Sequence, residues 1–385
     1  MVVTGRQFDN LLNLMKLIYL TSKTFPATTA DHFFVLEMAK AFALKLKNDF
    51  LLVVWNGRGK TLEEIPHYSL GMNTKKGKSL FYFVWLPFFI LSKKLYSRDT
   101  VFFSNDQPLL SHLFFWKKIL GFKYRVISDW HMISGGPKEL KSAKKSDGMI
   151  TTTKHLKDLL VSRFGPSEKK ILTAYGGVDL SLFKVDESRE DLRRRLELPE
   201  KSFLVGYIGL YKTMGLPKGI DTMIDATALL QGKNITMVFV GGKPDEITEY
   251  KAYTGKKKIL GYTIFIPVVS SKAVAEYEQA MDALVIPYPD LPHFRNFGFP
   301  MKAYEYLASK KPVIYSNLPI MGEVLADCAV SFTPGDSRDL AQKITDIQNS
   351  PEKASALVSL GYEKAKDCTW EKRAEKILEF AKAIK

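Results

Sequence analysis

The chain contains little cysteine and no apolar run long enough to cross a membrane. Cys328 and Cys368 are the only cysteines in 385 residues. Neither a disulfide framework nor a cysteine-based metal site is therefore expected, and a reducing, cytoplasmic location is favoured. The most apolar stretch, LFYFVWLPFFIL from Leu80 to Leu91, contains a proline and falls well short of the roughly twenty residues that span a bilayer. We expect it to be buried core or an interfacial segment.

Acidic residues are outnumbered by basic ones. The 41 Asp and Glu against 56 Lys and Arg give a formal net charge of +15 and a pI of about 9.4. Three partners fit this charge, namely nucleic acid, anionic lipid or a phosphorylated small molecule, and a lysine-rich solvated surface is the alternative to all three. The sequence has no Walker pattern, which disfavours a P-loop NTPase. It also has no known nucleic-acid-binding motif, so only its charge suggests a non-catalytic nucleic-acid-binding protein.

Short β-branched or aromatic runs alternate with amphipathic segments along the whole chain, a pattern that predicts an α/β fold with parallel sheets. The predicted strands of the first half are Leu17–Leu20, Leu51–Trp55, Thr100–Phe103, Tyr124–Ser128, Gly148–Thr151 and Ile171–Thr173. Those of the second half are Phe203–Gly209, Ile235–Gly242, Ala283–Pro287 and Pro312–Ser316. Ligands of such doubly wound domains bind where the carboxyl ends of the strands gather.

The chain is longer than one hydrophobic core usually serves, so we expect two domains. The charged stretch Phe183–Ser202 carries no strand pattern and indicates a linker with a short helix. The prediction is an N-terminal domain over 1–184 and a C-terminal domain over 185–365. Residues 366–385 are expected to form a helix that packs back toward the N-terminal domain.

A phosphate-facing stretch follows the strand that begins at Phe203. A helical apolar stripe starts at Ile220, so Lys218 and Gly219 come at or just before the N-terminus of that helix. Free N–H groups, the positive end of the helix dipole and a lysine ammonium would suit a diphosphate. Lys212 in the same loop could supply a second cation. Taken alone, a Lys-Gly pair before a helix is more often an ordinary cap.

Two further stretches could approach the same ligand. VFVGGKPDEI ends a strand at Gly242, whose lack of a side chain allows close backbone approach, although a plain tight turn is the simpler interpretation. Pro300 suits the first turn of a helix on which Lys302 and Glu305 share one face. A carboxylate there could accept both hydroxyls of a ribose, and the alternative is a solvated acid paired with Lys302.

In the first domain, polar residues follow two strands. Asp129 and His131 come directly after a strand, where the histidine could contact a sugar hydroxyl or stabilise charge and Asp129 could orient it. A structural histidine is the alternative. The loop after the first strand is a second candidate for a phosphate or acceptor contact. Its candidate residues are Thr28, Thr29, Asp31 and His32.

Taken together, these stretches resemble a known family. Their order and spacing are similar to those of family 4 retaining glycosyltransferases with the GT-B fold, the group 1 type. The similar stretches are MKLIYLTSKTFPATTADHFFVLEMAKAF, SDWHMI, GGVDLSLF, VGYIGLYKTMGLPKGIDTMIDA, VFVGGKPDEI, YEQAMDALVIPYP, PMKAYEYLASKKPVIYS and TWEKRAEKI. The resemblance covers nearly everything from Met15 onward and implies two Rossmann-like domains that face each other across a cleft.

The resemblance implies a hexosyl transfer, with retention of configuration, from a nucleotide-diphosphate donor to a glycan or lipid-linked acceptor. It also implies that domain 1–184 binds the acceptor and that domain 185–365 binds the nucleotide sugar. Lys218 would neutralise the diphosphate, and Glu305 would bind the ribose. His131 would lie by the transferred sugar, and Gly209 would begin the loop under the donor. No cofactor or metal is implied, because lysines and helix N-termini do that work and no Asp-x-Asp sequence occurs. A nucleotide-sugar epimerase of the same architecture is an alternative.

Two positions depart from the family pattern. The spacing of the family's paired glutamates puts Phe297 where the first acid would be. An arginine that often follows the glycine of the phosphate loop is Leu210 here, with Lys212 as a possible substitute. Both departures concern contacts to the donor, so they leave the donor's base and sugar open.

The basic charge has a further possible role at a membrane. Lysines flank the aromatic segments Leu80–Leu91 and Leu113–Trp116, and they are Lys75, Lys76, Lys78, Lys93, Lys94, Lys117 and Lys118. Basic residues beside exposed aromatic side chains would hold this domain on an anionic membrane, at the inner face, where a lipid-linked acceptor would be met. If both segments pack in the core, the lysines are simply solvated.

Overall fold

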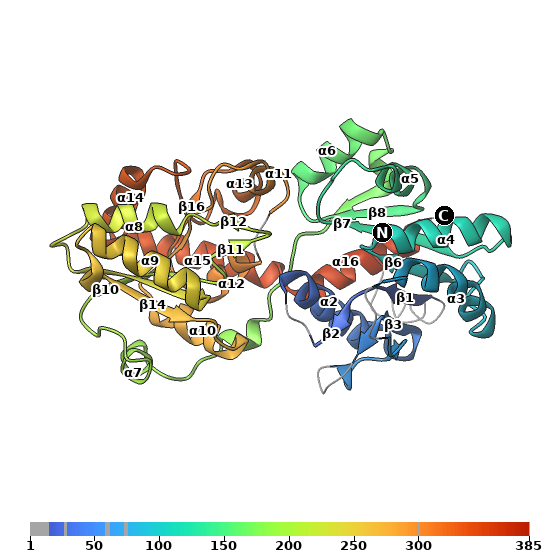
Figure 1. Cartoon of the computed structure of the whole chain (residues 1–385), viewed down its shortest axis with the longest axis horizontal. Helices are drawn as coiled ribbons and strands as arrows, with labels where there is room; N and C mark the ends of the chain where they lie inside the picture. Colours follow the sequence, from blue (N-terminus) through green and yellow to red (C-terminus); the bar gives the residue numbers. More distant parts are fainter. Residues whose placement is uncertain (1–14, 27–28, 58–61, 73–75, 299–300, 385) are drawn as a thin grey trace. The chain divides into compact units, whose positions relative to one another are not determined.

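The computed structural model describes residues 15–26, 29–57, 62–72, 76–298 and 301–384. It divides into two compact units, each described here by itself (Figure 1). The N-terminal unit comprises the chain up to Tyr175 together with Trp370–Lys385, and the C-terminal unit comprises Gly176–Thr369. The boundary predicted between residues 184 and 185 thus lies inside the C-terminal unit. The closing helix α16 (Trp370–Ala383) belongs to the N-terminal unit.

Within the described residues, the N-terminal unit contains a seven-stranded parallel sheet in the order β5-β3-β1-β6-β7-β8-β9. Its strands are β1 (Lys16–Leu20), β3 (Phe50–Val54), β5 (His67–Ser69), β6 (Thr100–Ser104), β7 (Arg125–Trp130), β8 (Gly148–Thr151) and β9 (Ile171–Thr173). Every strand predicted for this half is present, and β5, which has no apolar pattern, was not predicted. The strand order reverses at β1, which creates the switch point of a doubly wound sheet.

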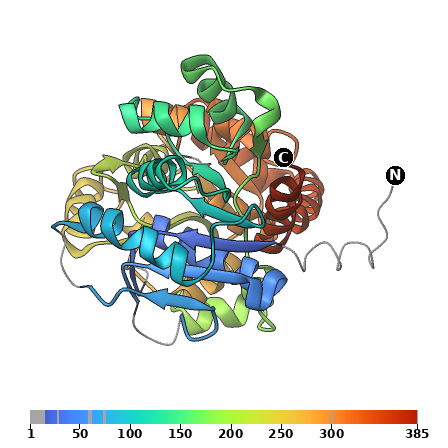
Figure 2. The ribbon, with the colours of Figure 1, turned by 90° about the vertical axis from the view of Figure 1, so that its right-hand side faces the viewer.

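Alternate residues of β1 pack on opposite faces of this sheet, as the two-residue period of a strand requires. Ile18 faces an apolar cluster that includes Tyr82 and Leu110 of two neighbouring helices, whereas Tyr19 contacts Phe42 on the other side. The helices of this unit are α2 (Ala30–Leu46), α3 (Lys78–Ser92), α4 (Gln107–Ile119), α5 (Pro137–Lys145), α6 (Lys154–Phe164) and α16. Helix α16 packs on α2, and α3 lies beside α4 (Figure 2).

The C-terminal unit repeats this architecture. Within the described residues its parallel sheet has six strands in the order β14-β13-β10-β15-β16-β17. They are β10 (Phe203–Ile208), β13 (Ile235–Gly242), β14 (Thr263–Pro267), β15 (Ala283–Ile286), β16 (Val313–Ser316) and β17 (Val330–Phe332). The order reverses at β10, between β13 and β15, so this sheet also has a switch point. Strands β14 and β17 were not predicted.

Helices surround the second sheet. They are α7 (Arg189–Arg195), α8 (Ile220–Leu229), α9 (Pro244–Lys256), α10 (Ser271–Ala280), α11 (Pro292–Asn296), α12 (Lys302–Ala308), α13 (Pro319–Leu325), α14 (Ser337–Asn349) and α15 (Pro351–Asp367). Across the described parts of both units, no helix combines the length and the apolar character needed to pass through a bilayer. The fold is therefore α/β with two Rossmann-like units, as predicted.

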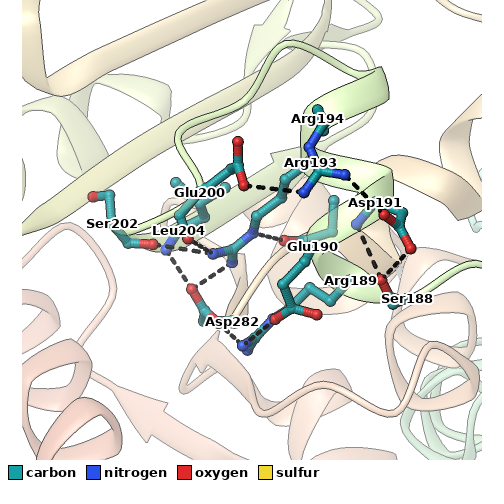
Figure 3. Close-up of polar contacts among 11 residues, drawn as sticks. Ser188, Arg189, Glu190, Asp191, Arg193, Arg194, Glu200, Ser202, Leu204 and Asp282 are labelled. Carbon is teal, nitrogen blue, oxygen red and sulfur yellow. Dashed lines mark hydrogen bonds and ion pairs between the residues drawn. The ribbon is translucent and has the colours of Figure 1, made fainter.

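Arginines of α7 connect the charged segment Phe183–Ser202, which was expected to be a linker, to the second sheet. Arg193 is buried, and its guanidinium donates to the Ala280 carbonyl at 2.8 Å and to Asp282 at 2.6 Å (Figure 3). The same Asp282 carboxylate accepts the Leu204 amide at 2.7 Å and pairs with Arg189 at 2.6 Å. These bonds fix α7 to the start of β10 and to the residue before β15. The segment therefore belongs to the C-terminal unit.

Candidate active site

The carboxyl end of β10 is built around Gly209. Its φ of 145° is a conformation that residues with a side chain rarely adopt. A Cβ atom at this position would lie 2.0 Å from the Lys302 ammonium nitrogen. The Gly209 amide donates to the Val240 carbonyl of β13 at 2.7 Å. Glycine is therefore required here because the loop passes directly over a lysine ammonium.

Lys302 is the buried cation of this site. Its Nζ donates to the Ile208 carbonyl at 2.7 Å and lies 4.8 Å from the centre of the Tyr207 ring. Burial lowers the pKa of Lys302, and the nearby carboxyls of Glu305 and Glu278 oppose that shift. Its ammonium thus faces the end of β10, and Lys302 is not a solvated partner of Glu305.

Glu305 lies in the first turn of α12 and is half-buried. Burial raises the pKa of this carboxyl above its usual value, and the Lys302 ammonium opposes the rise. A carboxyl in this position can accept hydroxyl groups from a ligand at the carboxyl edge of the sheet. Pro300, which was expected to start this helix, lies outside the described residues.

Lys218 supplies a second cation at the same edge. The residue precedes α8, whose N-cap Gly219 has a φ of 83° and sits so close to the Pro287 carbonyl that a Cβ would lie 1.8 Å from that oxygen. Lys218 is half-buried, and its Nζ lies 5.7 Å from the centre of the Tyr288 ring. Burial and then the Lys302 ammonium lower the pKa of Lys218 to about 7, against a smaller effect of Glu246. An anion bound here would favour its protonated form.

Two other predicted donor residues have protein neighbours of their own. The Nζ of Lys212, in the short strand β11 (Lys212–Thr213), lies 3.5 Å from a Glu249 carboxylate oxygen. Gly242 ends β13, and a Cβ there would lie 2.3 Å from the Tyr211 ring. The Tyr211 hydroxyl in turn donates to the Phe239 carbonyl at 2.9 Å. The glycine at 242 thus makes room for Tyr211.

The sequence did not predict Glu278 or His293 as part of this site. Glu278, on α10, is fully buried and interacts electrostatically with Glu305 and Lys302. His293, in α11, is close enough to Lys218 that burial and this ammonium both lower the pKa of its imidazole. The sequence contains one indication of either residue, namely its position in or near a stretch that resembles the glycosyltransferase family. Helical periodicity alone would have left Glu278 on a polar face.

In the N-terminal unit, Asp129 and His131 lie together at the carboxyl end of β7, as predicted. The His131 Nε2 is 3.2 Å from a carboxylate oxygen of Asp129. The same carboxylate accepts bonds from Arg373 at 3.1 and 3.2 Å. Burial by itself would raise the pKa of Asp129, but Arg373 and then His131 outweigh it and lower the pKa. Asp129 is therefore an ionised carboxylate that can hold the imidazole in one orientation.

Arg373 was not predicted, and it comes from α16 at the far end of the sequence. Its guanidinium also donates to the Tyr175 carbonyl at 3.0 Å and lies 5.0 Å from the Phe34 ring centre. The Phe34 ring packs against His131, with centroids 4.4 Å apart, and against Trp370 at 5.1 Å. The His131 cluster is thus assembled from β7, α2 and α16.

The predicted acceptor-side loop gathers polar groups at the carboxyl ends of β1 and β6. Asp31 forms an ion pair with Lys23 and accepts a bond from the Asn105 amide at 3.3 Å. The Thr29 hydroxyl is 2.5 Å from His32 Nδ1, while Thr28 lies outside the described residues. These residues surround the switch point of the first sheet. Across the described residues, no group of three or more His, Cys, Asp or Glu could hold a metal ion.

Comparison with known families identifies the second half of the chain. Residues 188–364, nearly all of the C-terminal unit, match the family described as Glycosyl transferases group 1. This matched region is called the group 1 domain below. The cluster at the carboxyl ends of β10 and β13 lies within it, with Gly209, Lys218, Lys302 and Glu305 contributed by different loops and helices.

Curated relatives of the group 1 domain carry glycosyltransferase names. TuaH of Bacillus subtilis, named for a proposed role in teichuronic acid biosynthesis, is 23% identical over 250 residues, which cover 65% of this chain and 58% of TuaH. A D-inositol 3-phosphate glycosyltransferase of Thermomonospora curvata is 23% identical over 252 residues, covering 61% of this chain and 56% of the relative. The chain thus spans somewhat more than half the length of the curated relatives it matches.

Solved structures resemble the whole chain. A glycosyltransferase from Rickettsia africae has a TM-score of 0.79 at 16% identity and covers 96% of this chain and 98% of its own. HepE of Anabaena, crystallised with UDP, has a TM-score of 0.77 at 18% identity and covers 95% and 99%. At these identities the likeness establishes the fold, and it agrees with the GT-B architecture expected from the sequence.

Proposed function

We propose that this protein is a glycosyltransferase that takes a sugar from a nucleotide-diphosphate donor bound by the group 1 domain. The observation that carries the proposal is the meeting of two lysines, Lys218 and Lys302, with Glu305 around the Gly209 loop. One ammonium just before the N-terminus of α8 and a second at the end of β10 suit a diphosphate, and a carboxyl nearby suits ribose hydroxyls. The acceptor in this proposal is a glycan or a lipid-linked glycan.

In this proposal the N-terminal unit supplies His131, oriented by Asp129, for the transferred sugar. The diphosphate charge is met by lysines and helix N–H groups, so no metal is required for donor binding. Transfer occurs with retention of the anomeric configuration, which NMR spectroscopy of a freshly formed product would test. An inverted product would refute the stereochemical part of the proposal and leave donor binding intact.

Uridine diphosphate sugars are the first donors to test. Solved structures of HepE, which shares the fold, are described as complexes with UDP, with UDP and glucose, and with UDP-glucose. That likeness supports a uracil nucleotide as the first to test. A thermal-shift screen of UDP-, GDP- and ADP-sugars would select the nucleotide.

Calorimetry on two variants tests the donor site. We expect Glu305→Ala and Lys218→Ala each to weaken binding of UDP-glucose by about tenfold or more, since each removes a charge-assisted contact. Glu352→Ala and Lys353→Ala, at exposed positions of α15 in the same unit, are the matched controls. Wild-type affinity in both site variants would refute the assignment of the donor site.

We further propose that the N-terminal unit meets an anionic membrane surface. Helix α3 exposes an apolar stripe along one side, with exposed fractions of 68% for Leu80, 53% for Val84, 68% for Phe88 and 50% for Leu91. No acidic residue occurs between Glu64 and Asp99. Tyr82, Leu86, Phe89 and Ile90 of the same helix are core residues. Helix α3 therefore combines a buried face with an exposed one. Lys75, one of the lysines predicted to flank this segment, lies outside the described residues.

Basic residues accompany this stripe on the neighbouring helix. A hollow of about 460 Å³ near the end of α4 is lined by lysines around two phenylalanines; the lining side chains are Phe114, Lys117, Lys118, Phe122, Lys123 and Lys145. Exposed Ile119 and Leu120 lie at the same end of α4. Apolar side chains ringed by lysines suit the interface of a bilayer with anionic head groups.

Flotation with phosphatidylglycerol-containing vesicles tests the membrane proposal. We expect the wild type to float at low salt and the double variant Leu80→Ser/Phe88→Ser to stay in the soluble fraction. Leu360→Ser, at another exposed leucine, in α15 of the C-terminal unit, is the control and should float. Failure of the wild type to float at low salt would refute this part of the proposal.

A further inference from the structure

Glu278 is a buried acid without a bonding partner. It is 0% exposed, and neither carboxyl oxygen has a hydrogen-bond partner within the described residues. The residue lies near the end of α10, two positions before the carbonyl of Ala280 that anchors Arg193. A buried polar group in this condition is costly, so its presence requires an explanation.

The groups that face Glu278 belong to the donor site. Its carboxyl interacts electrostatically with Lys302 and Glu305 of α12, and Tyr306 of the same helix also feels its charge. The Lys302 ammonium does not bond to either Glu278 oxygen, and among the described residues it donates to the Ile208 carbonyl at 2.7 Å. One ammonium is therefore enclosed with two carboxyl groups.

The surroundings of Glu278 and Glu305 decide which of the two carboxyl groups is protonated. An ionised carboxylate with no hydrogen bond and no contact with water is the least favourable state available, because burial penalises the charge and nothing compensates for it. Glu305 is half-buried at the edge of the sheet, where it can face a ligand. Burial, reinforced by Glu305, raises the pKa of Glu278 well above its usual value. The proton therefore stays on Glu278, and Glu305 is the group free to ionise.

We propose that Glu278 is a positioning residue of the donor site, a neutral carboxyl that occupies buried space near Lys302 without cancelling its positive charge. The inference rests on the proposed function. When Glu278 is neutral, the positive charge of the Lys302 ammonium can attract a diphosphate bound at Gly209. With Glu278 ionised, the three side chains would carry a net negative charge and would repel that diphosphate.

Three variants test this role. Glu278→Gln keeps a neutral polar group of the same shape, so UDP affinity measured by calorimetry at pH 7 should stay within about twofold of the wild type. Glu278→Ala empties the space that the carboxyl fills near Lys302, so that this lysine can shift, and should weaken UDP binding by about tenfold. Glu276→Gln, two residues away on the same helix and paired outward with Arg195 at 3.1 Å, is the control. Equal weakening in the Gln and Ala variants, or wild-type affinity in the Ala variant, would overturn the proposal.

Infrared spectroscopy gives a readout that needs no donor. At pH 7 the wild type should show a carbonyl band of a protonated carboxylic acid, which Glu278→Gln removes and Glu276→Gln keeps. An unchanged band in Glu278→Gln would overturn the proposal, whether or not UDP binds. If no nucleoside diphosphate binds the wild type while the band behaves as expected, the proposed function fails and the neutral state of Glu278 stands.

Discussion

The two units bury charge at the carboxyl ends of their strands in different ways. In the N-terminal unit the Asp129 carboxylate is bonded by both Arg373 and His131. In the C-terminal unit the Lys302 ammonium donates, within the part of the chain that the structure describes, to a carbonyl oxygen and to neither of the acids around it. In the first cluster the buried carboxylate is paired with a cation, so its bonds hold the His131 imidazole in place. In the second cluster the Lys302 ammonium is not bonded to a carboxylate, as expected of a site that binds an anionic ligand.

Removal of the cation from the first cluster should produce the largest effect. Arg373→Met leaves Asp129 as a buried, uncompensated carboxylate, and we expect a loss of about 3–5 kcal/mol in the free energy of unfolding. Urea denaturation measures this loss. The double variant Arg373→Met/Asp129→Leu should recover most of it. A loss below about 1 kcal/mol in the single variant would show that the cluster is not stabilised by its ion pair.

The same change in the second cluster should affect binding instead of stability. Lys302→Met replaces an ammonium that has no bonded acid, so the free energy of unfolding should change by less than about 1 kcal/mol, while UDP-glucose affinity falls by about tenfold or more. Urea denaturation and calorimetry on one preparation measure both quantities. A large loss of stability with unchanged affinity would reverse the comparison.

The pH dependence of donor binding should report Lys218. Its pKa of about 7 means that the ammonium is present below that pH and is lost above it. Because a diphosphate prefers the charged form, affinity for UDP-glucose should fall as the pH rises above 7, by up to about tenfold per pH unit. Lys218→Arg, which stays charged, should flatten the profile. Calorimetry at pH 6, 7 and 8 measures it, and identical profiles would exclude Lys218 as the titrating group.

The smallest effect is expected at Lys212. Its partner Glu249 is exposed, and exposed pairs contribute at most about 1 kcal/mol. Lys212→Ala should therefore change UDP-glucose affinity by no more than about fivefold. A tenfold loss in calorimetry would instead restore Lys212 as the substitute for the arginine that is replaced by Leu210.

The sequence predicted the fold where apolar runs were long and missed it where they were short. Strand β14 has partly exposed side chains, and β17 has only three residues, so neither has the pattern of a buried central strand. Helix α3 has apolar residues on every side, and periodicity could not separate its buried face from its exposed one.

For the candidate site, sequence reasoning found residues near glycines, prolines and strand ends and missed those within charged helical stretches. Lys218, Lys302 and Glu305 stood in stretches with recognisable turns. Glu278 and Arg373 stand in charged helical stretches, YEQA and TWEKRAEKI, where a polar residue ordinarily faces solvent. Only tertiary packing decides that these two are buried.

The membership of α16 in the N-terminal unit has a consequence for the order of events on the ribosome. The strands of that unit are synthesised first, and domains generally fold as they emerge. Arg373, however, reaches Asp129 only after the entire group 1 domain has been translated. Until then, a nascent N-terminal unit carries a buried acid without its cation. Its final consolidation is therefore an event that follows the synthesis of the second unit.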